Sequence, residues 1–226
     1  MKVEPTLVSN DRAEVNRLGK WLIVRFPKPQ IMLSWAIVRG GKVRGQTVAW
    51  YQVTSQDLNP QVEPRDFLKE KLSQASMPNA VGLLTSGDLN YYVDIEKTDG
   101  EYSVRCVATV GLSNALRVGD PPSILNHVGT INLVCQVSHS LSDEALIEAV
   151  SIAAEARTAA VLETRVPSKR SASPSTGTGT DCIVMAAPES NGQIRYVGKH
   201  TVIGHLIGSS VLEAVRSGID LWKSRY

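Results

Sequence analysis

The chain has 226 residues, of which 42% are hydrophobic, so it can bury a large core as one domain without a metal or a disulfide. Its 24 lysines and arginines nearly balance 22 aspartates and glutamates, and 5% of its residues are aromatic. This composition argues against a protein that binds nucleic acid mainly by charge or by base stacking.

The first half of the sequence predicts mainly β-structure. Apolar runs over residues 21–27 and 31–38 flank a Pro-Lys-Pro connection, which is typical of a turn, and a third run over 46–53 follows a Gly-Gly pair. An amphipathic helix is expected over 64–76, because a proline suits its first position and the apolar residues that follow share one side. The next apolar run, 80–86, ends in a turn signal and predicts another strand.

The middle of the sequence alternates apolar and polar residues, as strands do. Runs over 91–97 and 101–110 are joined by Thr98-Asp99-Gly100, and an Asp-Gly pair between alternating runs is a strong signal for a hairpin. Residues 131–137 alternate in the same way. One face of each strand is therefore expected to pack on the core.

Two long helices complete the pattern. Ser142 is placed to cap a helix over 143–163, with acidic residues in its first turn, and a second helix runs from about Thr201 to Lys223. Strands and helices mix without strict alternation. The sequence thus predicts a single α+β domain, in which a mixed or mainly antiparallel sheet packs against two or three helices, with an irregular N-terminal extension over residues 1–20.

Other features set expectations about chemistry and location. Cys106, Cys135 and Cys182 lie in apolar runs and are expected to be buried, reduced thiols. The histidines and carboxylates show no metal-binding spacing, so no metal site is expected. No apolar stretch approaches the roughly 20 residues that cross a bilayer. The N-terminal residues also lack a signal-peptide pattern, which predicts a cytoplasmic protein that binds neither membrane nor nucleic acid.

Four short polar segments lie next to the predicted strands and are candidates for chemistry: residues 84–88, 108–120, 175–181 and 196–201. The third of them, Ser-Thr-Gly-Thr-Gly-Thr-Asp, is the most unusual. Its glycines allow close backbone approach, and its N–H groups could bind an anion or a developing oxyanion. The same composition is also typical of a mobile linker, which is the alternative interpretation.

Two titratable residues stand beside these segments. Asp181 opens a predicted strand, where it could act as a general base, orient a base or cap a turn. His200 precedes a helix whose positive end favours a neutral imidazole, or else it caps that helix.

The order of these motifs resembles the adenosylcobinamide amidohydrolase family. The similarity covers roughly residues 30–218, and its specific blocks are Thr178-Gly179-Thr180-Asp181 and Gly198-x-His200-Thr201-x-x-Gly204. The supporting motifs are Leu33-Ser34 with Gly40-Gly41, Thr85-Ser86, and Thr109-x-Gly111-x-x-Asn114-Ala115. Arg39 departs from the family pattern, which has a small polar residue before the glycine pair.

The resemblance implies a hydrolase that cleaves the amide between the corrin ring and the aminopropanol arm of adenosylcobinamide. Its products would be adenosylcobyric acid and 1-amino-2-propanol, for use in cobamide salvage. A corrinoid is then the small-molecule partner, and no cofactor is implied, because cobalt enters only within the substrate. The oligomeric state is left open, with a homo-oligomer as one option. The alternatives are a corrinoid-binding module without hydrolysis and an amidohydrolase for a different amide.

Amide hydrolysis needs a nucleophile, a proton carrier and donors for the tetrahedral oxyanion. We hypothesise that Asp181 or His200 carries the proton, and that the nucleophile is an activated water or the hydroxyl of Thr180. The residues expected to bind the oxyanion and the substrate are Asn114, Thr178, Gly179, Thr85, Ser86, Thr109 and Thr201. Asn90, Tyr91 and Tyr92 could line a wide apolar corrin pocket, or they could lie on the surface of an edge strand. The hypothesis requires one cleft, with Asp181 and His200 flanking the threonine-rich turn.

Overall fold

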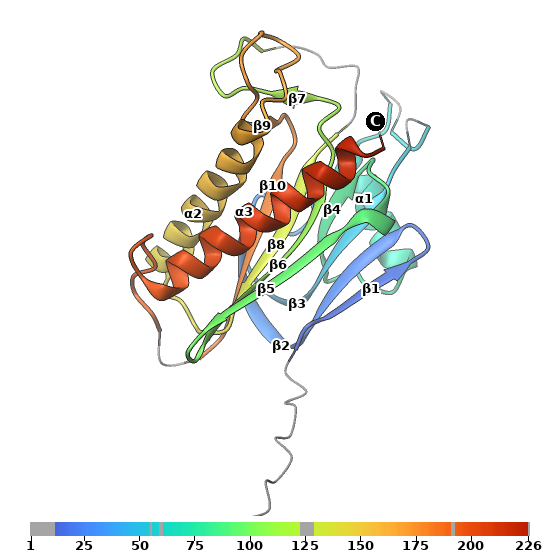
Figure 1. The fold of residues 1–226 in the computed structure, drawn as a ribbon. Coiled ribbons are helices and arrows are strands. Elements are labelled where there is room, and N and C mark those ends of the chain that lie inside the picture. The colour runs from blue at the N-terminus through green and yellow to red at the C-terminus, as the bar shows by residue number, and fades with distance from the viewer. Residues whose placement is uncertain (1–11, 55, 59–60, 123–128, 191–192, 226) are drawn as a thin grey trace, which may run out of the picture.

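The computed structural model of the chain describes residues 12–54, 56–58, 61–122, 129–190 and 193–225. This part of the chain forms a mixed eight-stranded sheet, a small two-stranded sheet and three α-helices (Figure 1). The predicted α+β class is confirmed. None of the described helices is both long enough and apolar enough to cross a membrane.

The large sheet follows the order β4-β3-β2-β10-β8-β6-β5, and β1 also pairs with β2. Its neighbours are antiparallel except β3 with β4 and β8 with β10, which are parallel. Its strands are β1 (Glu14–Leu18), β2 (Trp21–Ser34), β3 (Gly41–Gln52), β4 (Val81–Thr85), β5 (Val93–Asp99), β6 (Tyr102–Val110), β8 (Ile131–Val137) and β10 (Cys182–Pro188). The small sheet pairs β7 (Ala115–Leu116) with β9 (Gly177–Thr178). The helices are α1 (Pro64–Gln74), α2 (Asp143–Glu163) and α3 (Val202–Lys223), and a 3₁₀ turn covers Leu89–Tyr91.

Strand β2 is continuous where the sequence predicted two strands and a turn. Arg25 pairs with Thr47 but Gln30 pairs with Gly45, so the Pro-Lys-Pro segment bulges out of the ladder without ending the strand. Proline has no N–H to donate, and a bulge is one of the few places in a sheet that tolerates it. The prediction of a turn between two separate strands is therefore wrong.

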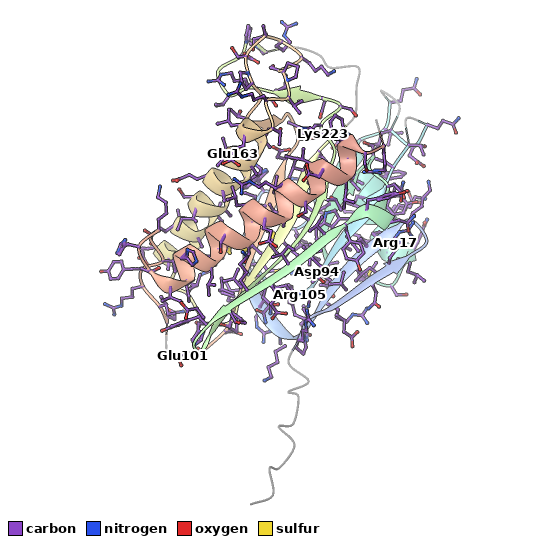
Figure 2. The ribbon with its side chains drawn as sticks, in the orientation of Figure 1. Arg17, Asp94, Glu101, Arg105, Glu163 and Lys223 are labelled. Atoms are coloured by element: carbon purple, nitrogen blue, oxygen red, sulfur yellow. The ribbon has the colours of Figure 1, made fainter. Side chains whose placement is uncertain are left out.

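The N-terminal residues also differ from the expectation. Glu14–Leu18 form β1 and pair with β2, so these residues are not an irregular extension, whereas residues 1–11 lie outside the described part. Arg105 on β6 donates to the carbonyl of Ala13 (2.5 Å) and forms an ion pair with Asp94 on β5. Figure 2 shows Asp94 and Arg105 close together on these two strands. The hydrogen bond from Arg105 therefore ties the residue before β1 to the sheet, and the ion pair with Asp94 holds the Arg105 side chain in place.

Three hydrophobic clusters lie between successive layers. Helices α2 and α3 cover one face of β5, β6, β8 and β10 (Figure 1). Helix α1 packs its buried Leu68 and Leu72 on β3 and β4. A third cluster, which includes Trp50, Val134 and Val184, joins the β2–β4 part of the sheet to the β6–β10 part. As a result, β8 and β10 are buried on both faces, and the polar residues on the second face of β8 lie inside the protein.

The predicted helix starts are confirmed. Ser142 accepts the N–H of Ala145 (3.3 Å) at the start of α2, and Thr201 accepts the N–H of Gly204 (3.0 Å) at the start of α3. A Cβ on Gly204 would lie 2.1 Å from the carbonyl oxygen of Val197, so only glycine allows this close approach. The three cysteines are free and buried, as expected.

Candidate active site

A cavity of about 790 Å³ brings together several of the predicted polar segments. Its volume falls within the range of about 300–1,000 Å³ that is typical of small-molecule sites. Five of the predicted site residues line it: Thr85, Ser86, Asn114, Gly179 and Thr180. The apolar part of its lining comprises Trp35, Ile37, Val53, Leu58, Pro64, Leu83, Leu84, Leu116, Pro121, Pro122 and Cys182, and the remaining residues are Arg117, Asp120, Gly129, Thr130 and Asn132.

Asp181 lies behind the threonine loop and organises it. Its Oδ1 accepts hydrogen bonds from the N–H of Ile131 (2.9 Å) and the hydroxyl of Thr178 (2.5 Å). Its Oδ2 accepts the N–H of Thr178 (2.9 Å) and forms an ion pair with Nη1 of Arg157 (3.1 Å). A Cβ at Gly177 would lie 2.3 Å from Oδ2, so this position has no room for a side chain. The carboxylate thus fixes the strand-to-loop geometry from β9 to β10.

These contacts change the expected role of Asp181. Its side chain is 5% exposed, and burial raises its pKa, while the charge of Arg157 and the hydrogen bonds from Thr178 act in the opposite direction. A general base needs a lone pair that faces the proton it removes. Both oxygens here are already engaged within the protein, so the geometry favours a positioning residue. The N–H and the hydroxyl of Thr178 both donate to Asp181, so neither is free to bind an oxyanion.

Thr180 and its neighbours form the polar side of the cavity. The Thr180 hydroxyl donates to the carbonyl of Gly129 (3.1 Å), and its own carbonyl accepts from the hydroxyl of Thr130 (2.9 Å). Thr180 is exposed and lines the cavity, so its hydroxyl lies within reach of a ligand, whereas its N–H makes a long hydrogen bond to the hydroxyl oxygen of Thr178 (3.4 Å). The mobile-linker interpretation of this segment is wrong, because β9 pairs with β7 and Asp181 ties the loop down.

Asn114 contributes a buried carboxamide to the cavity lining, and its oxygen has no hydrogen-bond partner among the described residues. The residue as a whole is 5% exposed. A buried polar atom without a partner costs free energy, and because Asn114 lines the cavity, a water or a ligand bound there could supply the missing partner. Because the two ends of a carboxamide can exchange by a flip, Asn114 can offer either an acceptor or a donor.

Further polar contacts join β4 and β8 at the cavity. Asn132 donates to the carbonyl of Leu84 (2.7 Å), and the Thr85 hydroxyl accepts the N–H of Gly87 (3.1 Å). Thr109 pairs with Asn132 across β6 and β8 and is buried, but it does not line the cavity. Thr109 is therefore a buried residue of β6 outside the cavity, and its predicted role in substrate binding is wrong.

His200 and Thr201 lie elsewhere. Asp181 directly precedes β10, whose seven residues span about 23 Å at the usual strand rise. The segment that carries His200 and Thr201 follows the other end of this strand in the sequence. His200 is exposed beside Gly198, next to Glu148 near the start of α2, whereas Arg157, the partner of Asp181, follows about 14 Å further along that helix. Figure 1 shows the start of α3 at the opposite end of α2 from β9. The expectation that Asp181 and His200 flank one cleft is wrong, and Thr201 serves as the cap of α3.

Sequence reasoning gave several residues of the site no role. Asp120, at the end of the predicted 108–120 segment, is the carboxylate that lines the cavity in the described part of the chain. It accepts from the Ser168 hydroxyl (2.5 Å), which lowers its pKa, and from the N–H of Arg117 (3.2 Å). Arg157 could have been noticed as a lone cation within an alanine-rich stretch of helix. No such signal marks Trp35. Asn90, Tyr91 and Tyr92 do not line the cavity.

The described residues contain no group of three or more histidine, cysteine, aspartate or glutamate side chains that could hold a metal ion. The thiol that lines the cavity is inert as well. Burial raises the pKa of Cys182 to about 12, which keeps it protonated at neutral pH.

Comparison with known proteins gives a consistent result. The family model for adenosylcobinamide amidohydrolase matches residues 6–226. An adenosylcobinamide amidohydrolase of Methanosarcina mazei is 28% identical over 194 residues, which cover 81% of this chain and 88% of that protein. Another from Halobacterium salinarum is 34% identical over 125 residues, which cover 52% of this chain and 50% of that protein.

Among solved structures, the PH0078 protein from Pyrococcus horikoshii OT3 overlaps 92% of this chain and 82% of its own, with 9% identity and a TM-score of 0.45. That likeness is too distant to support an argument about the site. The family match, in contrast, spans nearly the whole chain. This protein therefore belongs to the adenosylcobinamide amidohydrolase family and is an amidohydrolase.

Proposed function

We propose that this enzyme hydrolyses the amide that joins the aminopropanol arm to the corrin ring of adenosylcobinamide. Water adds across the C–N bond, so that the ring side becomes the carboxylic acid of adenosylcobyric acid and the arm leaves as 1-amino-2-propanol. The acid is an intermediate that cobamide synthesis can use, so the reaction would return incomplete corrinoids to that pathway.

One observation carries the proposal: a single cavity combines a largely apolar wall with a cluster of amide and hydroxyl groups. The apolar wall suits the faces of a corrin ring, and the polar cluster around Asn114 and Thr180 suits the amide of its arm. The cavity is smaller than a whole corrinoid requires, so we propose that the arm and one edge of the ring enter it.

The oxyanion of the tetrahedral intermediate would be held by the Asn114 carboxamide together with the N–H of Gly179. The N–H of Thr180 already donates to the hydroxyl oxygen of Thr178 (3.4 Å). Thr178 is not part of this set, because Asp181 takes its N–H. The loop is already fixed by Asp181 and Thr130, so these donors need little rearrangement when charge develops. One such donor is worth roughly 3–4 kcal/mol of transition-state stabilisation.

The attacking group in this proposal is a water molecule beside Thr180. We assign proton transfer to Asp120 because it is the carboxylate that lines the cavity in the described part of the chain. Its hydrogen bond from Ser168 lowers its pKa, so it is ionised at neutral pH but is a weaker base than an ordinary carboxylate. It would accept a proton from the water and return it to the nitrogen of the leaving amine. The return step is required, because an amine leaves readily only after its nitrogen is protonated.

A product analysis with matched variants tests this function. We expect the purified full chain to convert adenosylcobinamide into equal amounts of adenosylcobyric acid and 1-amino-2-propanol, as measured by mass spectrometry. Asn114→Leu should lower kcat by about 10²–10³, the usual cost of an oxyanion donor. Asn90→Leu, on the exposed turn outside the cavity, should change nothing. Corrinoid binding without any change of mass would instead indicate a binding role, and neither binding nor conversion would indicate a different amide.

A further inference from the structure

We infer that the indole ring of Trp35 is the surface on which the flat conjugated part of the corrinoid packs, and that Trp35 therefore sets specificity for the macrocycle. This inference rests on the proposed function and extends it from the amide to the rest of the substrate.

Trp35 is unusual for its position. It lines the cavity and is the aromatic residue that does so in the described part of the chain, yet 50% of it is exposed. A large apolar ring left half in water is a favourable surface for a flat apolar ligand to cover. Tyr91, which is also exposed, stands outside the cavity, and its ring lies 4.0 Å from the guanidinium carbon of Arg225.

The ring of Trp35 is held in one orientation. Its indole N–H donates to the backbone carbonyl of Asp181 at 2.5 Å. Its own backbone belongs to a tight loop after β2, in which the N–H of Ala36 donates to the Ser34 hydroxyl (3.3 Å) and a Cβ on Gly40 would lie 2.5 Å from the carbonyl oxygen of Ala36. A platform fixed before the ligand arrives gains affinity, because little conformational freedom is lost on binding.

The surroundings of the ring fit this role. Aliphatic side chains of Ile37 and Leu83 continue the apolar wall, whereas the Asn114 carboxamide and Thr180 supply the polar groups of the same cavity. A corrinoid needs both kinds of surface, since its ring faces are apolar and its edge carries amides. In this proposal Trp35 binds the ring, and the polar cluster around Asn114 and Thr180 binds the amide.

Binding measurements with two classes of ligand test the inference. Adenosylcobinamide and adenosylcobyric acid contain the macrocycle, whereas N-acetyl-1-amino-2-propanol carries only the amide and the arm. Trp35→Leu should raise the Kd of adenosylcobyric acid, measured by equilibrium dialysis followed by corrin absorbance, about tenfold, as expected for loss of an aromatic contact. The KM of adenosylcobinamide, which the enzyme consumes, should rise by a similar factor. Trp35→Phe should raise both constants less, because a ring remains. Binding of the ring-less amide should stay unchanged in both variants.

Two controls separate a ring contact from damage to the loop. Trp35→Phe and Trp35→Leu both lose the bond to Asp181, so a difference between them reports only the ring face. Tyr196→Leu removes another aromatic ring, 75% exposed and outside the cavity, and should leave every Kd unchanged. Equal corrinoid Kd values in the wild type and both Trp35 variants would overturn the inference. So would a fall in kcat that is the same in both variants and leaves corrinoid binding unchanged. A wild-type protein that fails to bind or cleave the corrinoid would overturn the proposed function instead.

Discussion

The guanidinium of Arg157, in the second half of α2, lies 3.1 Å from Oδ2 of Asp181, at the start of β10. Their side chains are 16% and 5% exposed, so the ion pair is largely shielded from water. Through Asp181 it connects the helical layer to Thr178 and Ile131, on the loop and the strand that border the cavity. The conformation of the candidate oxyanion loop therefore depends on a residue outside the loop.

Removing one partner of this ion pair should be costly. Arg157→Met leaves the Asp181 carboxylate buried without its cation and should lower the free energy of unfolding by about 3–5 kcal/mol. Urea unfolding of the full chain measures this loss. The double variant Arg157→Met with Asp181→Asn removes the charge as well as its partner, so it should recover part of the lost stability. Purely additive losses would contradict a direct coupling between the two residues.

The role of Asp181 can be distinguished from general-base catalysis by pH dependence. We expect Asp181→Asn to lower kcat, because the Thr178 bonds weaken, while the pH profile of kcat/KM keeps both of its limbs. A catalytic base would behave differently, since its removal abolishes the limb that reports its ionisation. Loss of the acidic limb in Asp181→Asn would contradict the positioning role.

Glycine at position 177 is required by contact with Asp181. Gly177→Ala would place a methyl group 2.3 Å from Oδ2, so the loop or the carboxylate must shift, and both turnover and stability should fall. Gly208→Ala in α3 is the matched control, because its Cβ would meet only a side-chain methyl of Ile152, at 3.7 Å. That control should be neutral or slightly stabilising, as alanine favours a helix over glycine by about 0.5–1 kcal/mol. Thermal melting and steady-state assays of both variants provide the comparison.

His200 offers a prediction in the opposite direction. It lies near the start of α2, at the far end from the cavity, so His200→Ala should leave kcat/KM within about twofold of the wild type, well below the 10²–10⁴ that general acid–base catalysis contributes. Asn114→Leu, assayed beside it, shows the loss expected of a cavity residue. A hundredfold loss in His200→Ala would place the chemistry at the N-terminus of α3.

Thr180 tests the choice of nucleophile. If water attacks the amide, Thr180→Ala should retain measurable turnover, reduced by about tenfold because the carbonyl of Gly129 loses its donor. Intact-mass analysis of protein quenched during turnover should find no corrinoid adduct. A Thr180→Ala enzyme without activity, together with an adduct in the wild type, would instead identify Thr180 as a covalent nucleophile.

Cys182 should be chemically silent despite its place at the cavity. Its pKa of about 12 leaves almost no thiolate at pH 7–9, whereas an ordinary thiol, with a pKa near 8.5, ionises across that range. Alkylation of the folded protein by iodoacetamide should therefore stay slow over this range, and it should become fast after unfolding in urea. Cys182→Ala should keep its turnover, and loss of all activity in that variant would contradict this assignment.

The sequence predicted best those features that local chemistry decides. The Asp99-Gly100 turn forms as expected, with Gly100 at φ 58°. The predicted cap at Ser142 starts α2, and α3 starts near Thr201 as expected, although the cap role of Thr201 was not predicted. The Gly-x-His-Thr-x-x-Gly block illustrates the ambiguity of such signals. Thr201 caps α3 and Gly204 admits the backbone of Val197, so two of its positions have structural explanations and do not require a catalytic site.

Features that depend on distant contacts could not be read from the sequence. The bulge in β2 depends on its pairing with β3, and the second buried face of β8 depends on the layer across it. The pairing of Arg157 with Asp181 likewise depends on how α2 packs against the sheet. The sequence therefore predicted which motifs contain residues of the candidate site. It could not predict which of these motifs lie together in the structure, because the strand order and the packing of the helices decide that.

The most direct test of the account is a structure of the slow Asn114→Leu variant, trapped with adenosylcobinamide bound. The account predicts that the arm amide lies among Thr85, Gly179 and Thr180, with the flat face of the corrin ring against the indole of Trp35. A corrinoid bound instead at the start of α3, beside His200, would contradict the central claim that the cavity lined by Asn114, Gly179 and Thr180 carries the reaction.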